Sequence, residues 1–201
     1  MKKIYGTNVL VALVAFCLVF AACKKETIDR LLTFYVQDEK EFELKKDELD
    51  EFMSKIPPGI DVRELIKVGL PLSVPPYEMT SSAQSTYTAE GTTAELVKDV
   101  KLEKLTLELL EPQNEDFSFL KSIHVYIKRP QDQDSLLLAY LDDIPAEPGN
   151  KLELIPSEQK VDKYLKAESY TVSTVVVIDE LIDSALKCNT RFRFKVTADP
   201  L

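Results

Sequence analysis

The 201-residue chain contains no tryptophan and a single histidine, His124. Without tryptophan, a carbohydrate-binding surface lacks its most typical side chain, and only the tyrosines remain to stack on sugars. The tyrosines that strand pattern or loop position would expose are Tyr35, Tyr77, Tyr87 and Tyr126. A hydrolase needs a nucleophile, a base and an orienting acid, and the sequence has no Gly-x-Ser-x-Gly elbow. We therefore predict a non-enzymatic protein with no catalytic residue and no cofactor.

Cysteine is also scarce, with only Cys17, Cys23 and Cys188 in the chain. If Cys17 leaves with an export signal and Cys23 is modified, Cys188 has no disulfide partner within its own chain. A lone cysteine most often behaves as a small buried hydrophobic residue, and we expect this of Cys188. Stability must then come from a packed core.

Charge is absent from Val9 to Ala22, directly after the basic start Met1-Lys2-Lys3. A positive segment followed by an apolar segment is typical of an export signal. As a helix, these residues span about 21 Å, less than the roughly 30 Å of a bilayer core. We therefore expect residues 1–22 to be a cleaved signal peptide and not a permanent anchor.

The export segment ends Leu18-Val19-Phe20-Ala21-Ala22-Cys23, which resembles a lipobox with Phe20 in place of the usual leucine. This resemblance implies cleavage before Cys23 and a lipid on that cysteine, with acyl chains such as palmitate. Two or three such chains hold a protein lastingly at a membrane surface. Residues 23–29 would be a lipidated tether. The next residue, Lys24, is not the aspartate of an inner-membrane retention signal, so we expect the outer membrane, on its periplasmic face or at the cell surface.

The mature chain would be strongly acidic, with 23 basic against 34 acidic residues once Lys2 and Lys3 are removed. A surface of this charge repels phosphate backbones, so we expect no nucleic-acid partner. Some of the acids gather in two predicted loops that a hard cation could in principle bind. These loop acids are Asp132, Asp134, Asp142 and Asp143. Their spacing matches no regular calcium loop, so we interpret them as solvated turn residues and predict no metal site.

The first half of the chain gives mixed signals. Apolar alternation over 32–36 and 42–44 predicts two strands joined by a polar turn at Asp38-Glu39-Lys40. Helical spacing over 49–56 predicts a short amphipathic helix that ends at Pro57-Pro58-Gly59.

Prolines dominate the segment that follows. Because of Pro71, Pro75 and Pro76, any strand in 60–79 must be an edge strand or broken. The Ser/Thr/Gly-rich stretch 81–93 predicts a long connection with one short strand at 86–88.

The second half contains five strand patterns separated by turn residues, at 105–109, 123–127, 136–141, 170–178 and 192–196. We expect single-turn helices at 116–120 and 161–166. The whole predicts a mostly β protein, an antiparallel β-sandwich of immunoglobulin-like or LEA14-like type with one or two short helices. The domain would span 30–201, with a potential sub-boundary within 71–93.

Two polar features on the predicted strands have ordinary explanations. The pattern places His124 on the face opposite Ile123 and Val125, where it would be half-exposed. Arg191, Arg193 and Lys195 form a basic stripe, which we expect to pair with cross-strand acids such as Glu108.

Several segments together resemble a group of uncharacterised lipoproteins of the Bacteroidota. They are 116–123, 125–127, 143–145, 149–150, 152–154 and 194–198. The resemblance implies export, lipidation and a β fold, and brings no activity. Our preferred hypothesis is a non-enzymatic envelope lipoprotein, a binding or structural module in an outer-membrane protein complex. A glycan- or nutrient-binding surface lipoprotein and a hydrolase with an unidentified carboxylate site are the alternatives.

Overall fold

The computed structural model describes residues 32–182 and 184–199. The predicted signal peptide, Cys23 and the tether therefore lie outside the described residues. About half of the described residues form strands in one antiparallel sheet, and none of the described helices is long and apolar enough to cross a membrane. The prediction of a mostly β, antiparallel protein with a few short helices is confirmed.

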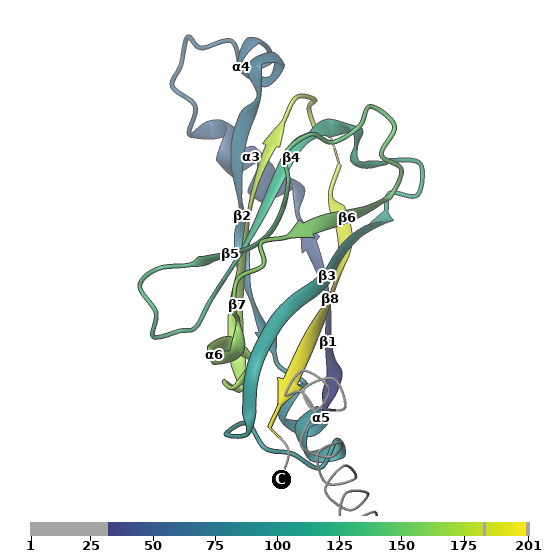
Figure 1. Cartoon of the computed structure of the whole chain (residues 1–201). Coiled ribbons are helices and arrows are strands. Elements are labelled where there is room, and N and C mark those ends of the chain that lie inside the picture. Colours follow the sequence, from purple (N-terminus) through teal and green to yellow (C-terminus); the bar gives the residue numbers. More distant parts are fainter. Residues whose placement is uncertain (1–31, 183, 200–201) are drawn as a thin grey trace, which may run out of the picture.

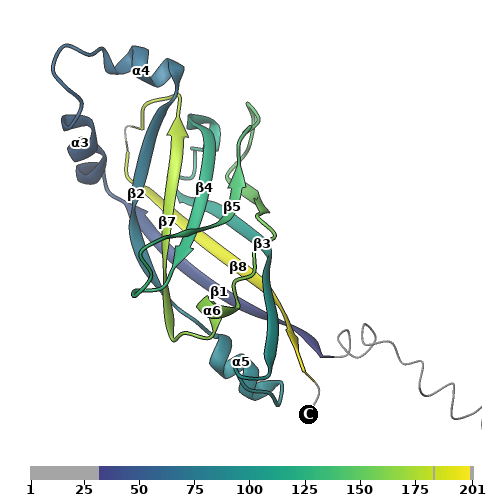
Figure 2. The same ribbon diagram turned by 60° about the vertical axis from the view of Figure 1, so that its left-hand side comes forward.

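The sheet contains eight strands within the described residues, in the order β1-β8-β3-β6-β5-β4-β7-β2. They are β1 (Thr33–Leu44), β2 (Leu70–Thr80), β3 (Val97–Glu111), β4 (Leu120–Lys128), β5 (Leu136–Leu141), β6 (Lys151–Pro156), β7 (Ser169–Ile178) and β8 (Leu186–Ala198). The sheet curls into a half-barrel, so that the wall formed by β1, β8 and β3 faces the wall formed by β4, β7 and β2 (Figures 1 and 2). The two separate sheets of an immunoglobulin-like or LEA14-like sandwich are not confirmed, because β5 and β6 link the two walls into one sheet.

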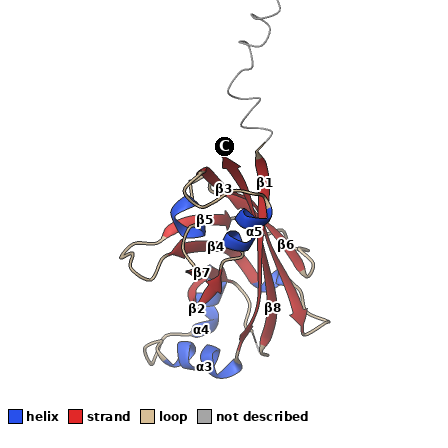
Figure 3. Cartoon of the chain, turned by 90° about the horizontal axis from the view of Figure 1, so that it is seen from below, coloured by secondary structure: helices blue, strands red, loops and turns tan. Residues whose placement is uncertain are grey.

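The helices lie at the two ends of the half-barrel. The connection from β1 to β2 holds α3 (Lys46–Ser54) and α4 (Val62–Val68), and Figure 1 shows both at one end of the molecule. At the other end, beside the C-terminus, lies α5 (Ala83–Ala89) (Figure 3). Short turns η1 (Phe117–Phe119) and α6 (Asp162–Leu165) occur in later connections, within the two segments where the sequence predicts them.

β1 is one continuous strand, so the predicted turn at Asp38-Glu39-Lys40 is wrong. Asp38 is only 5% exposed, and its carboxylate accepts hydrogen bonds from the Tyr170 hydroxyl and the Ser82 amide, both at 2.8 Å. Because these donors compensate the burial of a charge, the acid fits inside the half-barrel and the strand continues. The Ser82 bond joins edge strand β1 to the residues that follow β2, at the opposite edge of the sheet, and the Tyr170 bond joins β1 to β7.

The proline-rich segment behaves as predicted, because β2 is an edge strand that pairs only with β7. Its register with β7 shifts between Val74 and Tyr77, where Pro75 and Pro76 lack the amide hydrogens that a regular ladder needs. The short strand predicted at 86–88 is wrong, since these residues belong to helix α5. The helical spacing of Ala83 and Tyr87, both buried, explains the helix better than the β propensity of its threonines.

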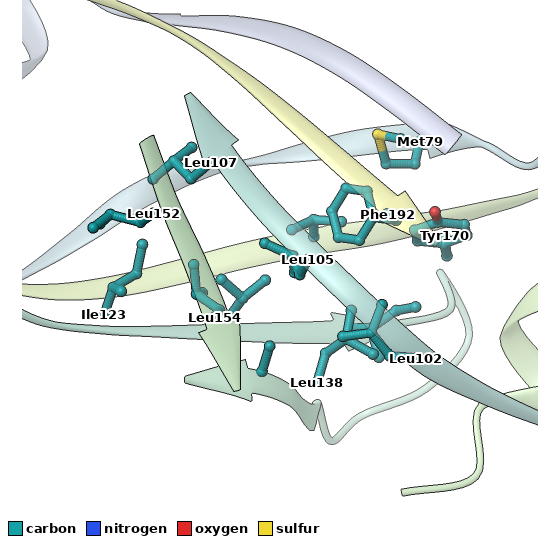
Figure 4. Packing of buried hydrophobic residues seen from close by; sticks show 14 of the residues in the cluster. Met79, Leu102, Leu105, Leu107, Ile123, Leu138, Leu152, Leu154, Tyr170 and Phe192 are labelled. Carbon is teal, nitrogen blue, oxygen red and sulfur yellow. The ribbon is translucent and has the colours of Figure 1, made fainter. Parts of the chain in front are cut away.

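Large side chains fill the interior of the half-barrel at the end beside α5, which we call the packed end. The rings of Phe192 and Phe194 stack 6.1 Å apart, and Tyr170 meets each of them edge-on. Figure 4 shows Met79, Tyr170 and Phe192 close together, with Leu102 and Leu105 of β3 nearby. This end of the half-barrel is therefore a conventional aromatic core.

Candidate functional site

A cavity of about 290 Å³ lies inside the half-barrel at the end beside α3, which we call the cavity end. Its wall is made almost entirely of aliphatic and aromatic side chains from strands on both sides of the half-barrel and from the loops that connect them. The wall residues include Phe42, Leu44, Leu72, Val74, Leu107, Phe117, Phe119, Leu120, Ile123, Thr174, Val176, Ile182, Leu186 and Cys188. An apolar, concave space with few polar groups is the usual form of a small-molecule site.

The cavity exists because inward-facing side chains become smaller along the same strands. On β8, Phe192 and Phe194 face the packed end, whereas Leu186 and Cys188 face the cavity. On β7, Tyr170 at the packed end gives way to Thr174 and Val176. These smaller side chains fill less of the interior than the rings at the packed end do.

Helix α3 provides a charged rim to this apolar space. Glu48, Glu51 and Lys55 line the cavity, and the Lys55 ammonium lies 3.0 Å from the Glu51 carboxylate. The Glu48 carboxylate accepts a hydrogen bond of 3.1 Å from the Lys45 amide at the start of the helix. An apolar interior with a polar rim suits an amphiphilic ligand, whose polar group would stay in water.

Phe42 lines the cavity and stacks on Tyr77, which borders a second, smaller void. Phe42 of β1 and Tyr77 of β2 lie 5.3 Å apart with an interplanar angle of 16°. The Tyr77 hydroxyl donates a hydrogen bond of 3.3 Å to the Thr190 hydroxyl on β8, and burial raises the pKa of Tyr77 to about 12. A second void of about 20 Å³ lies against these rings, and Phe42, Leu107, Ile123 and Thr174 border both spaces.

Cys188 lies in the cavity wall and is buried and free, as its sequence context predicts. Burial raises the pKa of its thiol to about 12. The thiol is therefore protonated near neutral pH and is a poor nucleophile. Its contribution to the cavity is small size and low polarity.

His124 lies on the outer face of β4, as its strand pattern predicts, and its side chain is 34% exposed. The imidazole Nε2 lies 2.8 Å from the Asp142 carboxylate, and Tyr126 and Tyr140 flank the ring at 6.5 and 6.2 Å. Its neighbour Ile123 points into the cavity, so the histidine faces away from it. The structure does not bring His124 and Cys188 together.

The predicted loop acids do not converge on one site. Asp132 is bonded to Arg129 and Lys163, and these cations lower its pKa to about 2. Asp142 is the partner of His124. Across residues 32–182 and 184–199, no group of three or more His, Cys, Asp or Glu side chains lies close enough to hold a metal ion.

Both arginines of the basic stripe on β8 are paired with acids on the outer face. Arg191 reaches Glu39 on one neighbouring strand and Glu108 on the other, each at 2.8 Å, so the predicted partner Glu108 is confirmed. Arg193 pairs with Glu103 and lies 4.0 Å above the Tyr35 ring. These contacts neutralise the two arginines and occupy Tyr35.

The four candidate tyrosines do not form one exposed surface. Tyr87, a residue of α5, is 1% exposed, and Tyr77 borders the small second void. Tyr35 and Tyr126 are on strands in opposite walls of the half-barrel. No aromatic platform that would stack on a sugar is built from these residues.

The sequence does not reveal the cavity, although one signal is present in it. Alternation predicts which residues of β7 and β8 point inward, and their sizes fall from Phe194 to Cys188 and from Tyr170 to Thr174. The void also depends on how strands distant in sequence face each other. The chain matches no protein-family model and no curated protein.

Proposed function

We propose that this protein is a non-enzymatic lipoprotein of the outer membrane whose half-barrel binds a small apolar or amphiphilic ligand at the cavity end. The apolar cavity of about 290 Å³ is the observation that carries the proposal. An apolar cavity of about 150 Å³ lined by similar side chains accepts a benzene ring. The ligand would therefore have an apolar part equivalent to about two rings, or an alkyl chain of comparable volume.

The low polarity of the wall supports binding over catalysis. Thr174 and Cys188 are the main polar side chains deep in the wall, and neither has a base beside it among the contacts of the described residues. Acyl transfer and hydrolysis both need a nucleophile that is paired with a proton acceptor. A binding module, the preferred hypothesis from the sequence, is consistent with such a wall.

The lipid anchor is proposed from the sequence. The lipobox-like segment ending at Cys23 and the resemblance to lipoproteins of the Bacteroidota support it. The proposal is a protein held at the outer membrane by acyl chains on Cys23, where it takes up its ligand or presents it to an envelope protein partner.

Ligand binding can be tested with N-phenyl-1-naphthylamine, a neutral apolar dye whose emission rises in apolar surroundings. The absence of tryptophan leaves the optical window of the dye free of protein signal. We expect saturable binding of one dye per chain and loss of binding in Val176→Phe, which places a ring in the cavity. The matched control is Val175→Phe, one residue along β7 and on the opposite face, which should bind as the wild type does.

No saturable dye binding by the folded wild-type chain, or equal binding by the Val176→Phe and Val175→Phe variants, would contradict the proposed cavity site. Lipidation needs a separate test. Mass spectrometry of the protein from membrane fractions should find a mature N-terminus at Cys23 that carries acyl chains, and Cys23→Ala should remove them. An unmodified Cys23 in a soluble product would rule out the anchor and leave the cavity proposal standing.

A further inference from the structure

We propose that the stacked pair of Phe42 and Tyr77 is the depth stop of the cavity, and that it sets the longest alkyl chain the protein accepts. The inference rests on the proposed apolar-ligand function. It adds a ligand class, single-chain amphiphiles of limited length, and names the residues that determine the limit.

The position of the two rings supports this role. They come from β1 and β2, the two edge strands of the sheet, and meet across the open side of the half-barrel. Their contact therefore closes the interior at this level without a ladder of backbone hydrogen bonds between the edges. Beyond them lies the packed end, where Asp38 and Tyr170 complete the closure.

The second void shows what the rings separate. It has a volume of about 20 Å³ and is bordered by Phe42 and Tyr77 themselves, together with residues that also line the main cavity. Space therefore continues past Phe42, which borders both voids together with Leu107, Ile123 and Thr174. The aliphatic residues Leu105 and Val125 line the space beyond, so it would accept a methyl end of a chain.

The two rings are held differently. Tyr77 is fixed to the opposite wall by its hydrogen bond to Thr190. Phe42 stacks on Tyr77, and its side chain is only partly buried. Removal of Phe42 should therefore open the barrier while Tyr77 stays in place.

The test is a series of alkyl maltosides from hexyl to dodecyl, titrated below their micelle concentrations by calorimetry into the full chain carrying Cys23→Ala. The neutral head group avoids any effect of the charged rim. Each methylene that enters the cavity should tighten binding about fourfold. In the wild type this gain should stop at one chain length, whereas in Phe42→Ala it should continue for about two more methylenes, a further tightening of roughly 16-fold.

The matched control is Phe34→Ala. Phe34 lies on the same strand and face as Phe42 and also packs on a tyrosine, Tyr87, at 5.9 Å, but at the packed end. This variant should keep the wild-type limit. Should Phe42→Ala fail to fold, Phe42→Leu keeps apolar bulk on the strand and should extend the limit by a smaller step.

The outcomes separate the two proposals. A wild-type chain that binds no maltoside of any length overturns the proposed function itself. Binding with the same length limit in the wild type and the folded Phe42 variants overturns only the depth stop. A limit that shifts equally in Phe34→Ala also overturns it, because loosening of β1 would then be the cause.

Discussion

The two ends of the half-barrel are built from the same strands and differ in the side chains that those strands place inside. At the packed end, Tyr170, Phe192 and Phe194 fill the interior, and Asp38 joins the two edges of the sheet. At the cavity end, Thr174 and Cys188 occupy the corresponding inward positions and leave about 290 Å³ unfilled. The packing that stabilises the fold and the proposed binding cavity therefore lie at different ends of the same strands. One end stabilises the fold, so the other can remain open.

The largest expected effect is loss of an aromatic side chain from the packed end. Phe192→Ala should lower the free energy of unfolding by about 3–5 kcal/mol, since the ring is 1% exposed and its removal leaves a cavity. Phe42→Ala should cost less than half as much, because that ring already borders empty space. Urea denaturation of both variants measures this contrast, and equal losses would remove the distinction between the ends.

The next largest loss of stability is expected when the hydrogen bond that closes the packed end is removed. The Tyr170 hydroxyl donates to the buried Asp38 carboxylate, so Tyr170→Phe should destabilise the protein by about 1.5–3 kcal/mol. The Tyr87 hydroxyl is also buried at this end but has no hydrogen-bond partner among the described residues. Tyr87→Phe should therefore leave stability unchanged or raise it by about 1 kcal/mol. Thermal denaturation should rank the variants in this order, and the reverse order would contradict the role of Asp38 as the junction.

A valine-to-phenylalanine substitution at two positions on β7 compares how tightly the two ends are packed. Val172 is fully buried at the packed end, so Val172→Phe should destabilise the protein by about 1–3 kcal/mol through overpacking. Val176 points the same way four residues along the strand and lines the cavity, so Val176→Phe should change stability by less than about 1 kcal/mol. A large loss in Val176→Phe would show that the cavity is not available space.

The smallest expected effect is on the reactivity of the Cys188 thiol. Because burial raises the pKa of Cys188 to about 12, its thiol should react with iodoacetamide at pH 8 at least about a hundredfold more slowly than a free cysteine. As the pH rises towards 12 the thiolate fraction, and with it the rate, should increase. Mass spectrometry of the Cys188 peptide gives the rate, and fast labelling at pH 8 would place the thiol in water.

The sequence predicts much of the sheet but not its curvature. Regular alternation reveals β3, β4 and β8, the density of valine and threonine reveals β7, and the prolines correctly place β2 at an edge. The turn predicted at Asp38 is wrong because its burial depends on Tyr170, which is 132 residues away in the chain. No local pattern reports such a contact. β6 (Lys151–Pro156) was likewise not predicted as a strand, since its alternation covers only the four residues from Lys151 to Leu154.

The cavity is the feature that is hardest to predict from the sequence. Polar and titratable residues such as His124 and Asp132 attract attention in a sequence, yet His124 is hydrogen-bonded to Asp142 and Asp132 is paired with Arg129 and Lys163. The residues that build the cavity are apolar and look like any core. Their significance is a missing volume, which arises only when both walls of the half-barrel are in place.

Methyl NMR of the chain titrated with N-phenyl-1-naphthylamine tests the central claim most directly. We expect the methyl signals of residues that line the cavity to shift as the dye binds. These residues include Leu72, Leu107, Val176 and Leu186. Signals of Val36, Leu102, Val172 and Val196, buried outside the cavity, should stay in place. Shifts spread over both groups, or confined to the outer surface, would contradict a binding site at one end of the half-barrel.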